Sequence, residues 1–336
     1  MRGLLSKKSI FLFILLIAAF ALPNFLKNKF YMNIVIMVIF YAALSGSWNI
    51  LAGYAGQLSL GHSIFFGLGA YTSTLLLVKM GVSPWLGIIA ALIMSMAVGA
   101  LIGYPAFRLK GPFFTLATLA FSEVIRYIAS FWKELTNGAM GINIPFKPGL
   151  ATMMFRTKEP YYFIALGMLL LIILITFFID RSKMGSYFIA IRENEDAAEV
   201  LGIPITRYKM YSMLISSGLA ALTGVFYAQY ILFIEPEAVF NINFSSQIAL
   251  MSIIGGMGTI FGPIVGAVLL VPLNEIMRSA FSSLNGLNFF IYGIVLIIVV
   301  SWMPNGILPT ITNQVKKRGL KVSTDRKGAG KIDTAN

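Results

Sequence analysis

Apolar stretches separated by one charged segment are the feature that most constrains this chain. Nine stretches are long or apolar enough to be membrane elements, namely residues 10–22, 30–51, 62–79, 85–107, 112–130, 160–179, 210–234, 245–273 and 286–303. Residues 180–209, by contrast, hold five of the thirteen acidic residues. A charged side chain is costly in hydrocarbon, so this segment must lie in water outside the bilayer. The pattern predicts an all-α, polytopic integral membrane protein.

Composition leads to the same class of protein. Hydrophobic residues make up 58% of the chain and charged residues 12%, whereas a soluble domain has roughly 45–50% and 25%. A soluble core cannot hide that much apolar surface. We therefore predict a single transmembrane domain over residues 1–309 and a basic tail at 310–336, whose composition is typical of disorder and which can lie along anionic lipid headgroups.

The stretch 245–273 differs from the others because glycine and proline interrupt it. It contains Gly255, Gly256, Gly258, Gly262 and Pro263, and such residues break a helix where neighbouring groups can re-satisfy the backbone. We expect a broken or re-entrant element here. The protein would then have about 8–10 transmembrane helices, depending on whether the two halves cross separately.

Basic residues set the expected orientation. If the N-terminus is cytoplasmic, alternation places Arg108, Lys110 and the bases of the charged segment on the same side, as the positive-inside rule requires. This predicts a cytoplasmic loop at 181–208, an extracytoplasmic loop at 131–159 and a cytoplasmic C-terminus. A second interpretation of residues 10–22, preceded by three bases, is a cleaved signal peptide.

Missing residue types narrow the chemistry. The chain has no cysteine, a single histidine, His62, and no G-x-x-x-x-G-K-[ST] phosphate loop. Thiolate and multi-histidine metal sites are therefore excluded, as is the usual nucleotide-binding loop of an ATPase. No enzyme activity, metal, cofactor or nucleic-acid partner is predicted. Energy for transport must come from a partner protein or from an ion gradient.

The candidate functional residues in the charged segment belong to a short acidic helix that ends at a glycine. They are Arg192, Glu195, Asp196, Ala197, Ala198 and Gly202. An ordinary solvated loop explains the bases of the segment but not an acid-rich helix with a glycine stop. Such a short exposed helix is suited to docking in a groove of a partner.

A second set of candidate residues is polar and lies in or between predicted spans. Asn49, Gln57, Ser59, His62 and Glu123 are its members. Gln57, Ser59 and His62 belong to a glycine-rich interruption, which predicts either unwound backbone lining a permeation path or a tight turn for close helix packing. Asn49, in the span before it, either lines the path or makes an interhelical hydrogen bond. Glu123 precedes Arg126 by three residues, so it is either a transport residue or one half of a neutralising pair.

Several segments together resemble a known family. Asp196-Ala197-Ala198, three further residues and Gly202 are similar to the coupling loop of bacterial ABC importer permeases, in which Glu usually stands in place of Asp196. The wider resemblance is to the larger of the two permease subunits for branched-chain amino acids. It rests on "LAGYAGQLSLGHSIFFGLGAY" at 51–71, "FFTLATLAFSEVIRYI" at 113–128, "TNGAMGI" at 136–142, "IRENEDAAEVLGIPITRYKMYSMLISSGLAALTGVFYA" at 191–228 and "IGGMGTIFGPIVGA" at 254–267.

The resemblance implies a permease subunit that lies in the inner membrane of a bacterial or archaeal cell and translocates leucine, isoleucine and valine without bond chemistry of its own. It also implies four partners: a homologous second permease, two cytoplasmic ATP-binding subunits and an extracytoplasmic solute-binding protein. On this interpretation the acidic helix docks to the ATPase. Alternatives are a permease for urea or short amides from the same branch, a simple-sugar permease, and a gradient-driven carrier or channel.

Overall fold

The computed structural model describes residues 19–26 and 28–280, and beyond them residues 293–294, 297, 301–303 and 306–312. Within these ranges, seven helices are long and apolar enough to cross a membrane, and an eighth apolar helix is shorter. The all-α, polytopic prediction is therefore confirmed. Most of the stretches 286–303 and 10–22, and residues 313–336 of the tail, lie outside the described residues.

The long helices follow the predicted apolar stretches closely. They are α2 (Lys29–Asn49), α3 (Ser63–Met80), α4 (Pro84–Ala106), α5 (Pro112–Phe131), α7 (Glu159–Asp180), α10 (Ile205–Ile231), α12 (Ile242–Gly256) and α13 (Gly262–Ala280). A five-residue π-helix, η1 (Ile50–Tyr54), continues α2. The short elements are α6 (Lys133–Thr136), the 3₁₀ turn η2 (Gly138–Met140), α8 (Lys183–Glu193), α9 (Glu195–Val200) and α11 (Pro236–Val239).

Two predicted boundaries need comment. The helix expected at 210–234 begins five residues earlier and ends at Ile231, since α10 extends into the charged segment. The stretch 245–273 is broken as predicted: α12 ends at Gly256, and α13 begins at Gly262 and packs against α12. Gly256 has φ +125° and Gly258 has φ +74°, conformations that favour glycine, so the break falls where the sequence tolerates it.

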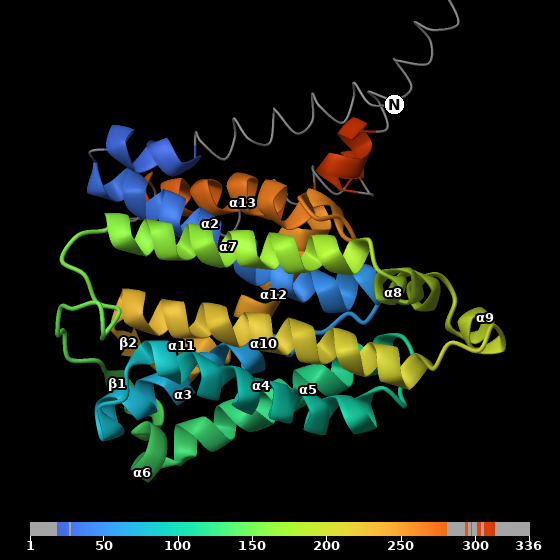
Figure 1. Cartoon of the computed structure of the whole chain (residues 1–336), viewed down its shortest axis with the longest axis horizontal. Coiled ribbons are helices and arrows are strands. Elements are labelled where there is room, and N and C mark those ends of the chain that lie inside the picture. Colours follow the sequence, from blue (N-terminus) through green and yellow to red (C-terminus); the bar gives the residue numbers. More distant parts are fainter. Residues whose placement is uncertain are drawn as a thin grey trace, which may run out of the picture.

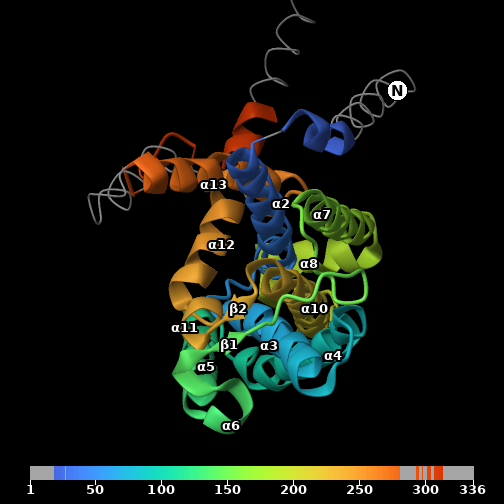
Figure 2. The ribbon, with the colours of Figure 1, turned by 90° about the vertical axis from the view of Figure 1, so that its left-hand side faces the viewer.

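Close packing of α10 against α3 forms the centre of the bundle (Figure 2). A Cβ atom added to Gly224 would lie 2.0 Å from the carbonyl oxygen of Phe66, and one added to Gly69 would lie 2.2 Å from that of Ala221. Only glycine permits this approach of the two backbones, as small residues do between membrane helices generally. The packing holds the segment before α3 against the middle of α10.

The two ends of the bundle carry different structures (Figure 1). At one end lie α8 and α9, from the charged segment. At the other lie α6 and a two-stranded antiparallel sheet, in which β1 (Ile142–Asn143) pairs with β2 (Phe233–Ile234). The loops predicted at 181–208 and 131–159 therefore occupy opposite ends, as a membrane protein with these spans requires.

Candidate coupling loop and translocation path

Helix α9 is the short acidic helix that the sequence predicts. Asn194 caps it, because its side-chain Oδ1 accepts a hydrogen bond from the backbone N–H of Ala197 at 3.0 Å. The helix stops at Gly202, whose φ is +80° and whose N–H donates to the carbonyl oxygen of Glu199 at 2.9 Å. Cap and stop confine α9 to six residues.

The base of α9 is fixed to the bundle by Glu195. Its Oε1 lies 2.6 Å from Nζ of Lys209, which is almost fully buried one turn inside α10. The same oxygen accepts a hydrogen bond from Nε2 of Gln57 at 3.1 Å. Ala198, on the inner side of α9, is also buried. Glu195 thus connects α9 both to α10 and to the segment before α3.

The tip of α9 presents apolar side chains that the sequence analysis did not single out. Val200 is 88% exposed and Leu201 is 78% exposed, although both lie in a polar loop outside the predicted spans. Adjacent exposed apolar side chains outside a bilayer are typical of a contact with another protein. The sequence feature that could have indicated this tip is the Val-Leu pair directly after the acidic residues.

Asp196 pairs within the chain. The ammonium of Lys110 lies 2.7 Å from its Oδ1, and both side chains are exposed. The hydrogen bond and charge of Lys110 lower the pKa of the Asp196 carboxyl below its usual value. This pair connects α9 to the loop between α4 and α5. The two acids proposed to meet a partner, Glu195 and Asp196, thus both have basic partners inside the protein.

Arg192, at the end of α8, contacts two irregular segments, the π-helix η1 and the break between α12 and α13. Its Nη1 donates to the carbonyl oxygen of Gly53 in η1 at 2.9 Å. A Cβ atom on Gly53 would lie 2.6 Å from the backbone nitrogen of Gly258, so the π-helix and the α12–α13 break touch here. The coupling loop therefore contacts the two irregular segments at the point where they meet.

Asn49 connects the end of α2 to the break between α12 and α13 by hydrogen bonds. Its Oδ1 accepts from the N–H of Gly258 at 2.9 Å and from the hydroxyl of Ser252 at 3.1 Å. Its Nδ2 donates to the carbonyl oxygen of Thr259, also at 2.9 Å. With its amide group satisfied and its side chain buried, Asn49 supports the backbone rather than a surface.

The segment from Ala55 to His62 is non-helical and packed between helices. The carbonyl oxygen of Ser59 accepts from the indole N–H of Trp48 at 2.7 Å, and that of Leu58 accepts from the hydroxyl of Thr115, also at 2.7 Å. The predicted path residues Gln57, Ser59 and His62 are all buried in this conformation. Unwound backbone is satisfied here by neighbouring side chains, as it must be at membrane depth.

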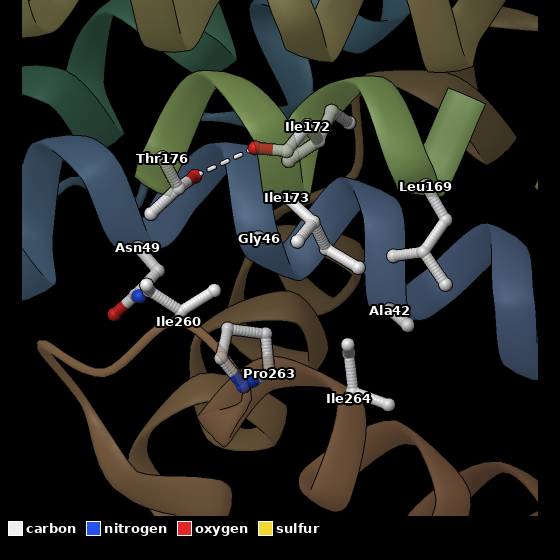
Figure 3. A pocket seen from close by; sticks show the side chains of 10 residues that line it. All are labelled: Ala42, Gly46, Asn49, Leu169, Ile172, Ile173, Thr176, Ile260, Pro263 and Ile264. Atoms are coloured by element: carbon white, nitrogen blue, oxygen red, sulfur yellow. Dashed lines mark hydrogen bonds between the residues drawn. The ribbon is translucent and has the colours of Figure 1, made fainter. Parts of the chain in front are cut away.

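Two cavities adjoin these elements. A cavity of about 10 Å³, room for about one water molecule, lies between α2, α7 and the start of α13; Asn49 stands at one end of its apolar lining (Figure 3). A groove of about 540 Å³ between α4, α7, α8 and α10 is lined by apolar side chains and Ser182. The first is too small for an amino acid, and the second lacks charged groups to bind one.

Glu123 belongs to an ion cluster on α5. Its Oε2 is 2.6 Å from Nη2 of Arg126, one turn later on α5. Nη1 of Arg126 is in turn 2.5 Å from Oε2 of Glu237 on α11. The sequence predicted the first pair, whereas Glu237 is 111 residues distant in the chain and was missed.

The helical spans and the break between α12 and α13, taken with the family match that follows, define a membrane transport permease. Residues 30–300 match the family described as "Branched-chain amino acid transport system / permease component". The chain belongs to this family.

Curated relatives extend over most of the chain. It is 32% identical to the high-affinity branched-chain amino acid transport system permease protein LivM of Salmonella typhimurium, covering 92% of this chain and 77% of that protein. LivM of Escherichia coli K12 is 31% identical with the same coverage. The corresponding LivH protein of Escherichia coli K12 is 26% identical over 80% of this chain and 91% of its own length. No solved structure matches the chain.

Proposed function

We propose that the chain is the larger permease subunit of an ATP-binding cassette importer that translocates leucine, isoleucine and valine across the inner membrane. The observation that carries the proposal is α9, a capped helix with an exposed Val200–Leu201 tip whose base is tied to α10 through Glu195 and Lys209. This arrangement suits a lever on which a partner ATPase acts. The similarity to LivM proteins supports the substrate class.

The partners follow from the same proposal. A homologous second permease completes the path, and its existence is supported by the chain's similarity to LivH as well as LivM proteins. Two cytoplasmic ATP-binding subunits supply energy. A solute-binding protein delivers substrate at the opposite end, where the loop 131–159 exposes Met140 and Leu150. The end that carries α9 would then be cytoplasmic, as would the N-terminus and the C-terminus, in agreement with the distribution of bases.

The test is ATP-dependent uptake of labelled leucine, isoleucine and valine into vesicles that contain the full assembly, with urea and a neutral sugar as competitors. The variant is Val200→Asp with Leu201→Asp. Removing apolar anchors from an interface costs on the order of 2 kcal/mol, roughly thirtyfold in affinity, so we expect ATPase subunits to dissociate and uptake to be lost. Leu201→Met, which keeps an apolar side chain, is the matched control.

Each alternative has its own outcome. Normal uptake by the double Asp variant would disprove the docking role of α9. Transport of urea or sugar alone would assign the chain to another branch of substrates. Uptake by the purified chain without ATP and partners would indicate a gradient-driven carrier instead.

A further inference from the structure

Glu123, Arg126 and Glu237 form an ion cluster that is partly exposed on the surface of a membrane-spanning bundle. The side chains of Arg126 and Glu123 are 19% and 31% exposed, and that of Glu237 is 62% exposed. Glu237 accepts a further hydrogen bond from Nδ2 of Asn241 at 3.1 Å. The cluster therefore lies on the surface of the subunit, on the flank formed by α5 and α11.

This surface lies at membrane depth. Glu123 is eleven residues from the start of α5 and eight from its end, which corresponds to about 16 Å and 12 Å along the helix axis. The hydroxyl of the adjacent Ser122 bonds to that of Ser63, at the start of α3. Exposed charges at such a depth do not face lipid, so this flank must face protein or water.

The opposite side of the bundle gives the contrast. In Figure 2, α5, α11 and α12 lie on one side and α4 and α7 on the other. Large exposed hydrophobic side chains occur on both sides, for example Leu101 of α4, Phe178 of α7 and Val124 of α5. The two sides differ in charge, because α4 has no charged residue and α7 has charged residues only at its ends, whereas α5 exposes the ion cluster within its length. The side with α4 and α7 suits lipid, whereas the α5–α11 flank suits a second permease with an aqueous path between the two subunits.

The charge of the cluster indicates what it binds. One guanidinium stands between two carboxylates, so the three side chains carry a net charge of −1. Glu123 already neutralises Arg126 from within α5, and Glu237 adds a negative charge that is more than half exposed. A zwitterion can pair with both kinds of group in the cluster. Its ammonium group can bind a carboxylate, and its carboxylate can accept hydrogen bonds from free N–H groups of the guanidinium.

We propose that Glu123, Arg126 and Glu237 form a transient binding site for the charged ammonium and carboxylate groups of the transported amino acid, in a water-filled path completed by the second permease. This inference rests on the proposed function. The internal ion pairs exchange for pairs with the substrate, so that no charge is left bare as the amino acid passes. The apolar side chain of the substrate plays no part in the site, which therefore serves leucine, isoleucine and valine alike.

The natural absence of cysteine makes the test direct. Asn243, exposed at the start of α12, is connected to Glu237 through Asn241, whose side chain bonds to both residues. It is changed to Cys in the assembled permease pair. A membrane-impermeant thiol reagent should modify this cysteine, and leucine should slow the modification. Leu101→Cys, on the apolar face of α4, is the matched control and should stay unmodified. The leucine concentration that halves the rate measures occupancy of the site.

Charge variants then assign the contact. In the Asn243→Cys background, Glu237→Gln should raise the half-protecting leucine concentration tenfold or more, and Glu237→Asp should restore it substantially. A leucine analogue without the ammonium group should protect both backgrounds equally weakly. Arg126→Lys, which keeps the charge but loses the planar fork, should also raise the half-protecting concentration, and it provides a second reading if the Gln variant assembles poorly.

An unmodified Asn243→Cys, or a half-protecting concentration unchanged by Glu237→Gln and Arg126→Lys, would overturn the site. A Glu237→Gln variant that fails to assemble with the second permease, combined with normal protection in Arg126→Lys, would assign the cluster to subunit contact instead. ATP-dependent leucine uptake by the wild-type assembly tests the proposed function separately. If leucine is taken up but does not protect the introduced cysteine from the thiol reagent, this site is refuted while the proposed function stands.

Discussion

At the scale of single residues, the most consequential contact is the ion pair of Lys209 and Glu195. The Lys209 side chain is only 2% exposed, and its partner belongs to α9. A buried ammonium without its carboxylate is strongly unfavourable, so a broken buried pair costs more than an intact one gains. The pair therefore ties the base of α9 to α10.

We predict that Glu195→Gln lowers the free energy of unfolding by about 3 kcal/mol, because it leaves the buried Lys209 ammonium without a counter-ion. Thermal unfolding of the purified permease in mild detergent measures the change. Asp196→Asn is the control: its partner Lys110 is exposed to water, as Asp196 itself is, and solvent replaces the lost contact. Equal midpoints for Glu195→Gln and wild type would show that the Lys209 pair adds nothing to stability.

At the scale of elements, the approach of α3 to α10 depends on glycine. The Cβ position of Gly224 is blocked by backbone atoms of α3, which cannot rotate away as a side chain would. The sequence predicted both helices but not which glycines lie against the backbone of the other helix. Gly218, for example, is also in α10, but its nearest neighbour is the flexible side chain of Met96.

We predict that Gly224→Ala destabilises the protein by about 1–3 kcal/mol, the usual cost of overpacking. The matched control is Gly167→Ala on α7, where no atom lies within 4 Å of the added Cβ. That change should be neutral or stabilise by up to about 1 kcal/mol, because alanine favours helix. The midpoint of thermal unfolding in detergent distinguishes them, and similar effects of the two substitutions would contradict the close approach.

At the scale of the whole molecule, the sequence predicted the helices but not the contacts between them. Apolar length located the spans, and glycine and proline located the break after α12, because both signals are local in the chain. The contact of Arg192 with Gly53 joins residues 139 positions apart, and no local pattern encodes such a distance. The sequence pattern identified Asn49 as polar and within a span, but its bonds to Ser252, Gly258 and Thr259 needed the fold.

The Arg192 contact carries the last prediction, which concerns coupling across the assembly. Arg192 joins the coupling loop to η1 and lies against Gly258 in the α12–α13 break, so loss of its guanidinium should disconnect ATPase movement from both broken helices. We expect Arg192→Met to retain bound ATPase subunits and ATP hydrolysis while leucine transported per ATP falls about tenfold, as loss of one charge-assisted hydrogen bond allows. Simultaneous measurement of uptake and phosphate release gives this ratio.

The control for Arg192→Met is Arg207→Met, at the start of α10, where the guanidinium bonds to the hydroxyl of Tyr211 on the same helix at 2.7 Å. A contact within one helix transmits no movement between elements, so its loss should leave the transport ratio unchanged. Arg192→Lys should restore the ratio in part, because a lysine ammonium also donates to a carbonyl oxygen but has a different reach and geometry. If Arg192→Met and Arg207→Met lower the ratio equally, surface charge rather than the contact with Gly53 governs coupling.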